Sequence, residues 1–158
     1  GRACIGDYVL DRPERLFHVG RLDAETEGLL ILTNDGELAN RLAHPSHGIL
    51  KTYVATIRGA FPKEALRALR AGVDLEDGRI ECDSVRVIQQ AADRTMVEVV
   101  IHEGRNRIVR RMFDEVGHPV VNLVRTRIAP IRLDQQRPGA LRAIEGRELR
   151  ALYTEAGL

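Results

Sequence analysis

The sequence predicts an α+β fold, in which helices flank a sheet, and three observations support this class. The chain has 158 residues, a length that suits one ordinary domain with a sizeable core. Hydrophobic residues make up 44% of it and charged residues 30%, as in globular proteins. Segments with strand character outnumber those with helix character and do not alternate regularly with them. This order favours an α+β protein over a doubly wound parallel sheet.

Each expected element rests on a local pattern. Alternating or β-branched apolar residues predict the strands, and apolar residues spaced three or four apart predict the helices. Asp35 or a neighbour can cap the first helix, Pro62 can open the second, and Gly72 and Gly117 can end the second and third. The expected elements are strands at 16–19 and 28–33, a helix ending at 42, a strand at 51–58, a helix at 62–71, strands at 85–88 and 96–101, a helix at 105–116, a strand region at 120–131 broken near Pro130, a short strand at 141–144 and a last helix at 147–153.

The cationic residues are unusual in kind and in position. The formal net charge is only +1, but 22 of the 24 cationic residues are Arg. Arginine suits bidentate phosphate recognition, although GC-rich coding also explains a high arginine count. Seven arginines fall within 28 residues and are opposed by few carboxylates nearby in the sequence: Arg105, Arg107, Arg110, Arg111, Arg125, Arg127 and Arg132. This stretch predicts a basic surface for nucleic acid.

Several classes of protein are disfavoured. No apolar run approaches the roughly 20 residues that cross a bilayer, and no signal-peptide pattern opens the chain. Cys4 and Cys82 form no metal-ligand spacing with the five histidines and no disulfide framework, so we expect no metal site and a cytoplasmic location. Four of the histidines are interpreted as turn or surface residues: His44, His47, His102 and His118.

The stretch from Gly20 to Gly36 contains a carboxylate in a distinctive place. Asp23 lies two residues after Arg21, with Val19 before it and the apolar run 29–32 after it. An Asp in this position is expected at the lip of a core, where neighbouring groups set its basicity and orientation. Such a carboxylate can act as a nucleophile or as an acid-base group. The alternative interpretation is a solvated turn residue between two strands.

Two further segments stand out. In Lys51-Thr52-Tyr53 a tyrosine begins a strand, where the alternative is a half-buried core aromatic. The second segment runs from 103 to 112, and on a helical wheel Arg107 and Arg111 lie opposite its apolar arc. Arg110 lies at the edge of that arc, where a side chain can extend from the core toward a cleft.

These three segments, in this order, resemble the catalytic domain of the ribosomal-RNA pseudouridine synthases of the small-subunit/large-subunit (RsuA-like) type. The resemblance covers about residues 15–152 and includes the later segments 117–120 and 123–128. The form Glu-Gly-Arg-Asn-Arg at 103–107 is more similar to the large-subunit members. The resemblance implies a central, mixed but mostly antiparallel sheet flanked by helices, with an active-site cleft across it.

The resemblance also sets an expectation about domains. It implies that residues 1–158 form one catalytic domain. Most members of the family carry an N-terminal, S4-like RNA-binding module as well. This chain begins at Gly1-Arg2-Ala3 and shows no segment of that kind, so the module is expected to be absent from it.

The resemblance implies the catalytic residues. Asp23 matches the catalytic aspartate, and Tyr53 matches the tyrosine that stacks on the target base and is a candidate for proton transfer. Arg110 matches the basic residue that pairs with the catalytic carboxylate, and Arg105 is the second choice for that partner. A cation beside Asp23 would keep the carboxylate ionised in a desolvated pocket.

The resemblance also implies substrate-binding residues. Leu123 matches the apolar residue that lines the base pocket, and Arg21 matches an arginine that contacts the RNA where the flipped base was. Independently of the resemblance, Arg105, Arg107 and Arg111 are expected to bind the substrate; the helical wheel places Arg107 and Arg111 where they contact either solvent or RNA phosphates.

The expected function is therefore isomerisation of a specific uridine in ribosomal RNA, expected in the 23S molecule, to pseudouridine. We expect no cofactor and no metal, and a monomeric, cytoplasmic enzyme. One alternative is a non-catalytic RNA-binding or ribosome-assembly module on the same fold, which would have no need of Asp23, Tyr53 and Arg110. Another is a carboxylate-based hydrolase such as a glycosidase, which would need a second catalytic carboxylate in a comparable motif.

Overall fold

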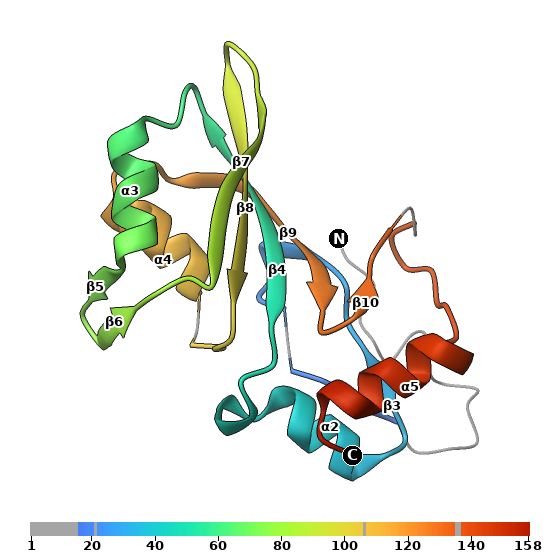
Figure 1. Ribbon diagram of the computed structural model, residues 1–158. Coiled ribbons are helices and arrows are strands. Elements are labelled where there is room, and N and C mark those ends of the chain that lie inside the picture. The colour runs from blue at the N-terminus through green and yellow to red at the C-terminus, as the bar shows by residue number, and fades with distance from the viewer. Residues whose placement is uncertain (1–15, 21, 106, 135–136) are drawn as a thin grey trace.

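The computed structural model describes residues 16–20, 22–105, 107–134 and 137–158, and the statements below concern these residues. A six-stranded sheet forms the centre, with β10, β9, β4, β8 and β7 in that order and β2 beside β9 (Figure 1). The pairing of β2 with β9 is parallel and the other pairings are antiparallel. The strands are β2 (Thr26–Gly28), β4 (Lys51–Arg58), β7 (Ser84–Gln90), β8 (Arg94–Ile101), β9 (Val120–Ile128) and β10 (Ile131–Arg132). The predicted α+β class and the mixed, mostly antiparallel sheet are confirmed.

One hydrophobic core lies between the sheet and helices α3 (Lys63–Ala71) and α4 (Ile108–Glu115) (Figure 1). The short hairpin of β5 (Val73–Leu75) and β6 (Gly78–Ile80) follows α3. The two helices are amphipathic, so each turns one apolar face inward. Their buried apolar residues are Ala65, Leu69, Ile108, Val109, Met112 and Phe113.

A second core lies at the other end of the molecule, around α2 (Gly36–Ala43) and α5 (Gly146–Glu155) (Figure 1). The two-stranded pair of β1 (Phe17–His18) and β3 (Leu32–Thr33) and the 3₁₀ turn η1 (Pro45–His47) belong to this end. Its buried residues include Val19, Leu29, Ile31, Leu38, Leu42, Ile128 and Leu152.

Asp35 connects the helices of this second core. Its Oδ1 accepts a hydrogen bond from Leu38 N at 3.1 Å, which makes it the N-cap of α2 as expected. Its Oδ2 accepts a hydrogen bond from the Tyr153 hydroxyl at 2.7 Å, and this bond lowers the pKa of Asp35. The C-terminal helix is therefore attached to the start of α2.

The structure differs from the prediction in four places. The expected strand at 28–33 is divided between β2 and β3, which belong to different sheets, because the backbone turns at Gly28 with φ +118°. Residues 141–144 form no strand. Helix α4 begins at Ile108 rather than 105, because Arg107 takes a left-handed conformation with φ 54°. The hairpin β5–β6 was not predicted, since its strands are only three residues long and carry charges.

Candidate active site

A pocket of about 560 Å³ opens between the two cores, and residues of both cores line it. Val19, Leu42 and Ile128 come from the second core, and Ile108 and Leu123 come from the first. Most of the pocket's charge is positive. Its described ionisable lining consists of one aspartate, one tyrosine and four cations: Asp23, Tyr53, Lys51, Arg105, Arg107 and Arg125.

Three adjacent strands bring the predicted residues together. Thr26 of β2 is paired with Leu123 of β9, and Leu123 is also paired with Ala55 of β4. Asp23 precedes β2 by three residues, and Tyr53 lies on the same face of β4 as Ala55. The order β2, β9, β4 therefore places Asp23, Leu123 and Tyr53 around one pocket, although they are distant in the sequence.

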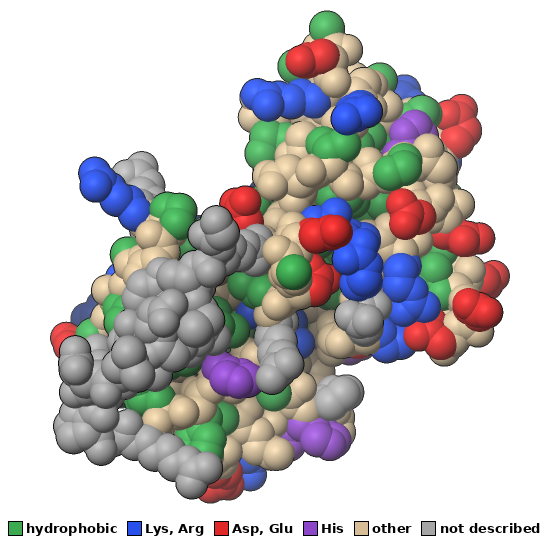
Figure 2. Space-filling view, turned by 180° about the vertical axis from the view of Figure 1, so that it is seen from behind, with side chains coloured by type: hydrophobic (Ala, Val, Ile, Leu, Met, Phe, Trp, Pro, Cys, Tyr) green, Lys and Arg blue, Asp and Glu red, His purple; other side chains and the backbone are tan. Residues whose placement is uncertain are grey.

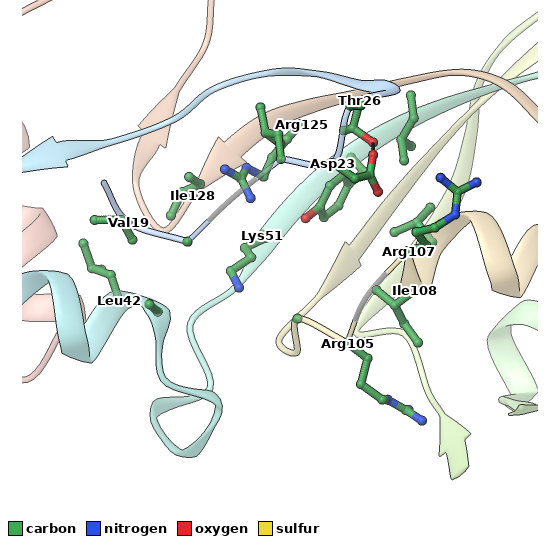
Figure 3. A pocket seen from close by; sticks show the side chains of 18 residues that line it. Val19, Asp23, Thr26, Leu42, Lys51, Arg105, Arg107, Ile108, Arg125 and Ile128 are labelled. Carbon is green, nitrogen blue, oxygen red and sulfur yellow. Dashed lines mark hydrogen bonds between the residues drawn. The ribbon is translucent and has the colours of Figure 1, made fainter. Parts of the chain in front are cut away.

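The next turn of the chain holds Asp23. The Thr26 hydroxyl donates to Asp23 Oδ1 at 2.6 Å, and Thr26 N donates to the Asp23 carbonyl at 3.0 Å. Thr26 is buried and Asp23 is half-buried. The carboxylate is thus held by a buried neighbour while part of it faces the pocket (Figure 3). The sequence analysis did not single out Thr26, although a hydroxyl three residues after an aspartate in a turn is a recognisable signal.

The strand that carries this loop lies close against β9. An added Cβ at Gly28 would lie 2.2 Å from the Arg125 carbonyl oxygen, so only glycine permits this approach. Leu29 N donates to the Arg125 carbonyl at 2.9 Å, and Arg125 Nε donates to the Leu29 carbonyl at 3.0 Å. The Asp23 loop and the Arg125 guanidinium are positioned by the same contact.

Arg110 connects α4 to the Asp23 loop through the main chain. Its guanidinium donates to the Glu25 carbonyl at 2.7 Å and to the Val120 carbonyl at 3.4 Å, and the residue is only 9% exposed. The described contacts of Arg110 therefore reach the loop two residues after Asp23 and not the carboxylate itself. Its predicted pairing with Asp23 stays a prediction, and the described lining of the pocket does not include Arg110.

Arg105 and Arg111 are bound to carboxylates from other segments. Arg105 pairs with Glu103 and, at 3.2 Å, with Asp77 in the turn between β5 and β6. Arg111 also pairs with Asp77, at 2.5 Å, and this hydrogen bond is the main cause that lowers the pKa of Asp77. Arg105 lines the pocket, whereas Arg111 is not among its described lining residues.

Arg107 and Arg21 complete the predicted set. Arg107 lines the pocket and pairs with Glu25 at 3.2 Å. Arg21 lies outside the described residues. The arginines at 105–111 were expected to be opposed by few carboxylates, yet chain segments remote in sequence supply Glu25 and Asp77. Figure 2 agrees, because acidic side chains are interspersed with the basic ones on the face that it shows.

Two cations of the pocket were not predicted as site residues. Lys51 is half-buried, and its pKa is lowered by burial and then by repulsion from Arg125. Arg125 is 3% exposed, and its Nη2 has no hydrogen-bond partner among the described residues. A signal for both existed in the sequence, because each lies two residues from a predicted site residue on the same strand face, Lys51 from Tyr53 and Arg125 from Leu123.

Three further features of the described residues concern metal ligands, the cysteine and membrane-spanning helices. They contain no group of three or more His, Cys, Asp or Glu side chains that could hold a metal ion. Burial raises the pKa of the Cys82 thiol to about 11, which disfavours a thiolate nucleophile. In the described part of the chain, no helix combines the length and apolar character needed to cross a bilayer.

Comparison with known proteins identifies the class to which this fold and this pocket belong. A family model described as RNA pseudouridylate synthase matches residues 7–115, which is more than half of the chain. The chain belongs to this family, and the resemblance stated from the sequence is confirmed.

The chain is also similar to individual members of this family. The chain is 52% identical to an uncharacterized RNA pseudouridine synthase of Mycobacterium tuberculosis, over 100% of its own length and 63% of the relative. It is 42% identical to the ribosomal large subunit pseudouridine synthase B of Bacillus subtilis, over 96% of its own length and 63% of the relative. A crystal structure of a pseudouridylate synthase superposes with a TM-score of 0.76 and 31% identity, over 87% of this chain and 59% of that one. The chain thus spans less than two thirds of the length of these relatives.

Proposed function

We propose that this chain carries the catalytic site of a ribosomal-RNA pseudouridine synthase that isomerises a specific uridine of the large-subunit RNA. One observation carries the proposal: the Asp23 carboxylate is held by Thr26 at the edge of a pocket that also presents Tyr53, Leu123 and several cations. The names of the Bacillus subtilis relative and of a 41% identical Pseudomonas aeruginosa relative, both ribosomal large subunit pseudouridine synthase B, support the choice of RNA.

The reaction matches this set of groups. It breaks the bond between uracil N1 and ribose C1′, turns the base and forms a bond between C5 and C1′. C5 loses a proton and N1 gains one, so the atoms balance without an oxidant or reductant. A carboxylate near C1′ can attack the sugar or remove its 2′ proton, and Asp23 is placed to do either.

The other residues have roles in binding the flipped base. A base that leaves its stack loses aromatic contacts, and the ring of Tyr53 offers a new face with Leu123 on the pocket wall. Arg110 orients the Asp23 loop through the Glu25 carbonyl. Arg105, Arg107 and Arg111 contact phosphates, and Arg21 contacts the RNA at the position that the base has left. We further propose that the protein works as a cytoplasmic monomer without metal or cofactor.

The substitution Asp23→Asn tests the proposal, because it is nearly isosteric and removes the nucleophile or base. Tritium release from ribosomal RNA containing 5-tritiated uridine should be abolished, while RNA binding and the unfolding transition stay close to wild type. Glu27→Gln is the matched control, since Glu27 is an exposed carboxylate of the same segment outside the pocket lining and its variant should react normally. Normal turnover by Asp23→Asn would overturn the catalytic role of Asp23, and a wild type that binds RNA but releases no tritium would favour a non-catalytic RNA-binding module.

A further inference from the structure

The cations of the pocket fall into two groups with different surroundings. Arg105 and Arg107 have carboxylate partners, as described above. Among the described residues, neither Lys51 nor Arg125 has a carboxylate within ion-pair distance. Figure 3 shows Lys51 and Arg125 on one side of Asp23 and Arg107 on the other. The first two form what we call the unpaired side of the pocket.

The buried positive charges of the unpaired side lower the stability of the free protein. The Arg125 guanidinium is almost fully buried and uses Nε on the Leu29 carbonyl, while Nη2 has no partner among the described residues. Lys51 brings a second positive charge into the same half-buried space, and its pKa is lowered first by burial and then by repulsion from Arg125. Two desolvated like charges with unused donors cost stability unless an anion joins them.

Two glycines line the pocket together with Lys51 and Arg125. Gly20 and Gly104 line the pocket here and present no side chains. An added Cβ at Gly104 would lie 3.4 Å from Lys51 Nζ, which places the ammonium directly beside the main chain of that loop. At Gly20 an added Cβ would meet no atom within 4 Å. Because Lys51 and Arg125 both line the pocket, an anion bound in it lies beside their positive charges.

The register of the strands relates these cations to the base site. Tyr53 is paired with Arg125 across β4 and β9, and Lys51 lies two residues from Tyr53 on the same face. A strand advances by about 3.3 Å per residue, so Lys51 lies roughly 7 Å along β4 from the ring on which the base would stack. The phosphates of an RNA strand are the anions that come this close to a stacked base.

We propose that Lys51 and Arg125 form a subsite for a phosphodiester of the RNA strand next to the target uridine. This inference rests on the proposed function and names the part of the substrate that the unpaired side recognises. Arg125 contributes a planar donor and Lys51 a compact charge, a combination suited to a phosphate oxygen pair. The described charged and titratable groups that share the pocket with this subsite are Asp23, Tyr53, Arg105 and Arg107.

The chain offers a direct test, because Lys51 and Lys63 are its only two lysines. Lys63 is exposed on α3 and outside the pocket lining, so it serves as an internal reference. Acylation of both amines by an amine-specific reagent is followed by peptide mass spectrometry. A uridine-containing oligoribonucleotide or uridine 3′-monophosphate, present at about ten times its Kd, should slow labelling of Lys51 about tenfold. Uridine alone should give no such protection, and Lys63 should label at a constant rate.

Binding measurements give a second readout. Lys51→Met should weaken binding of a single-stranded RNA oligonucleotide about tenfold and reduce the slope of log affinity against log salt by about 0.7. Lys63→Met should change neither quantity. Lys51 is the position to vary because Arg125 also holds Leu29, so that its replacement would disturb the fold. Equal labelling of Lys51 with and without nucleotide, protection by uridine alone, or equal affinity of the two lysine variants would each overturn the proposal.

The same assays separate this proposal from the proposed function. Asp23→Asn should show the same nucleotide protection of Lys51 as the wild type, although it releases no tritium. If the wild type isomerises uridine but nucleotides leave Lys51 unprotected, the subsite is wrong and the function stands. If Asp23→Asn releases tritium normally while Lys51 is protected, the catalytic assignment is wrong and the subsite stands.

Discussion

The two sides of the pocket hold the same kind of charge in opposite circumstances. On one side Arg105 and Arg107 are neutralised by Glu103, Asp77 and Glu25. On the other side the positive charges of Lys51 and Arg125 repel each other, and neither residue has a carboxylate partner among the described residues.

The difference shows why a count of arginines is a poor guide to RNA contacts. A cation that already has a carboxylate partner gains little from a phosphate, because it must first give up the carboxylate. A buried cation without such a partner gains the whole interaction, because the cost of desolvation is already present in the free protein. We therefore expect the unpaired side to anchor the RNA strand near the base, and the paired side, Arg105 and Arg107, to make weaker, salt-sensitive contacts.

The largest expected effect is a loss of stability when the contact between β2 and Arg125 of the unpaired side is disrupted. Gly28→Ala would force β2 away from Arg125, because its Cβ would meet the Arg125 carbonyl at 2.2 Å and its φ is +118°. We expect a loss of about 3–4 kcal/mol in the free energy of unfolding, measured by urea denaturation. Gly59→Ala is the control for conformation alone, since Gly59 has φ +71° and no atom within 4 Å of an added Cβ. It should lose only about 1–2 kcal/mol, and equal losses would show that the approach to Arg125 imposes no constraint.

Removing the link between α4 and the Asp23 loop should affect chemistry more than binding. Arg110→Ala deletes the hydrogen bonds to the Glu25 and Val120 carbonyls. The single-turnover rate of tritium release at saturating RNA should fall about 100-fold, because the carboxylate is no longer held in position. If Arg110→Ala lost only RNA affinity and kept its saturated rate, Arg110 would belong with the phosphate contacts, and the catalytic role should move to Arg105.

The paired side can be tested by releasing its arginines. Asp77→Asn weakens the hold on Arg105 and Arg111 and leaves both cations in place. RNA affinity at low salt should then rise about two- to fivefold, since an exposed ion pair holds its cation only weakly. Asp114→Asn, at an exposed carboxylate of α4 outside the pocket lining, is the control and should bind as the wild type does. A fall in RNA affinity for Asp77→Asn would mean that Asp77 holds the arginines in the position that binds RNA, and does not compete with RNA for them.

The smallest effect concerns stability and its dependence on pH. Burial and Arg125 lower the pKa of Lys51 in the folded chain below its ordinary value of 10.5. The charged form is therefore disfavoured by folding, and the fold gains stability as the pH rises through the lowered pKa toward 10.5. Lys51→Met should raise the Tm at neutral pH by about 1–2 °C, and the difference from wild type should shrink at high pH. Calorimetry measures these Tm values, and Lys63→Met is expected to show no change. A lower Tm for Lys51→Met would contradict the view that burying the Lys51 charge destabilises the fold.

Much of the fold could be predicted from local patterns. The alternation at β4 predicted that strand with its observed bounds, and the apolar arc of α4 predicted the end of that helix to within one residue, because each element buries one regular face. The strand expected at 28–33 was wrong, since its apolar composition does not show that Gly28 turns the chain from one sheet into another. The hairpin β5–β6 was missed because its strands are short and contain charged residues.

Some residues of the site could be predicted from the sequence and others could not. Asp23, Tyr53 and Leu123 were predicted through motifs, and the order β2, β9, β4 explains why such distant residues line one pocket. Arg125 was predicted only as part of the basic stretch and Lys51 only as the start of a motif, although the strand alternation placed each on the face of a predicted site residue; their burial could not be predicted from the sequence. The partners of Arg105 and Arg107 could not be predicted either, since Asp77 and Glu25 are brought to them only by the tertiary fold.

The proposed activity of this pocket is the formation of pseudouridine in ribosomal RNA, and a map of the modified sites in cells measures that product directly. Pseudouridines would be mapped at nucleotide resolution in the ribosomal RNA of cells that lack this protein. We predict that a large-subunit site is lost, that the wild-type protein restores it, and that Asp23→Asn does not. An unchanged map in the cells that lack the protein, or full restoration by Asp23→Asn, would contradict this prediction.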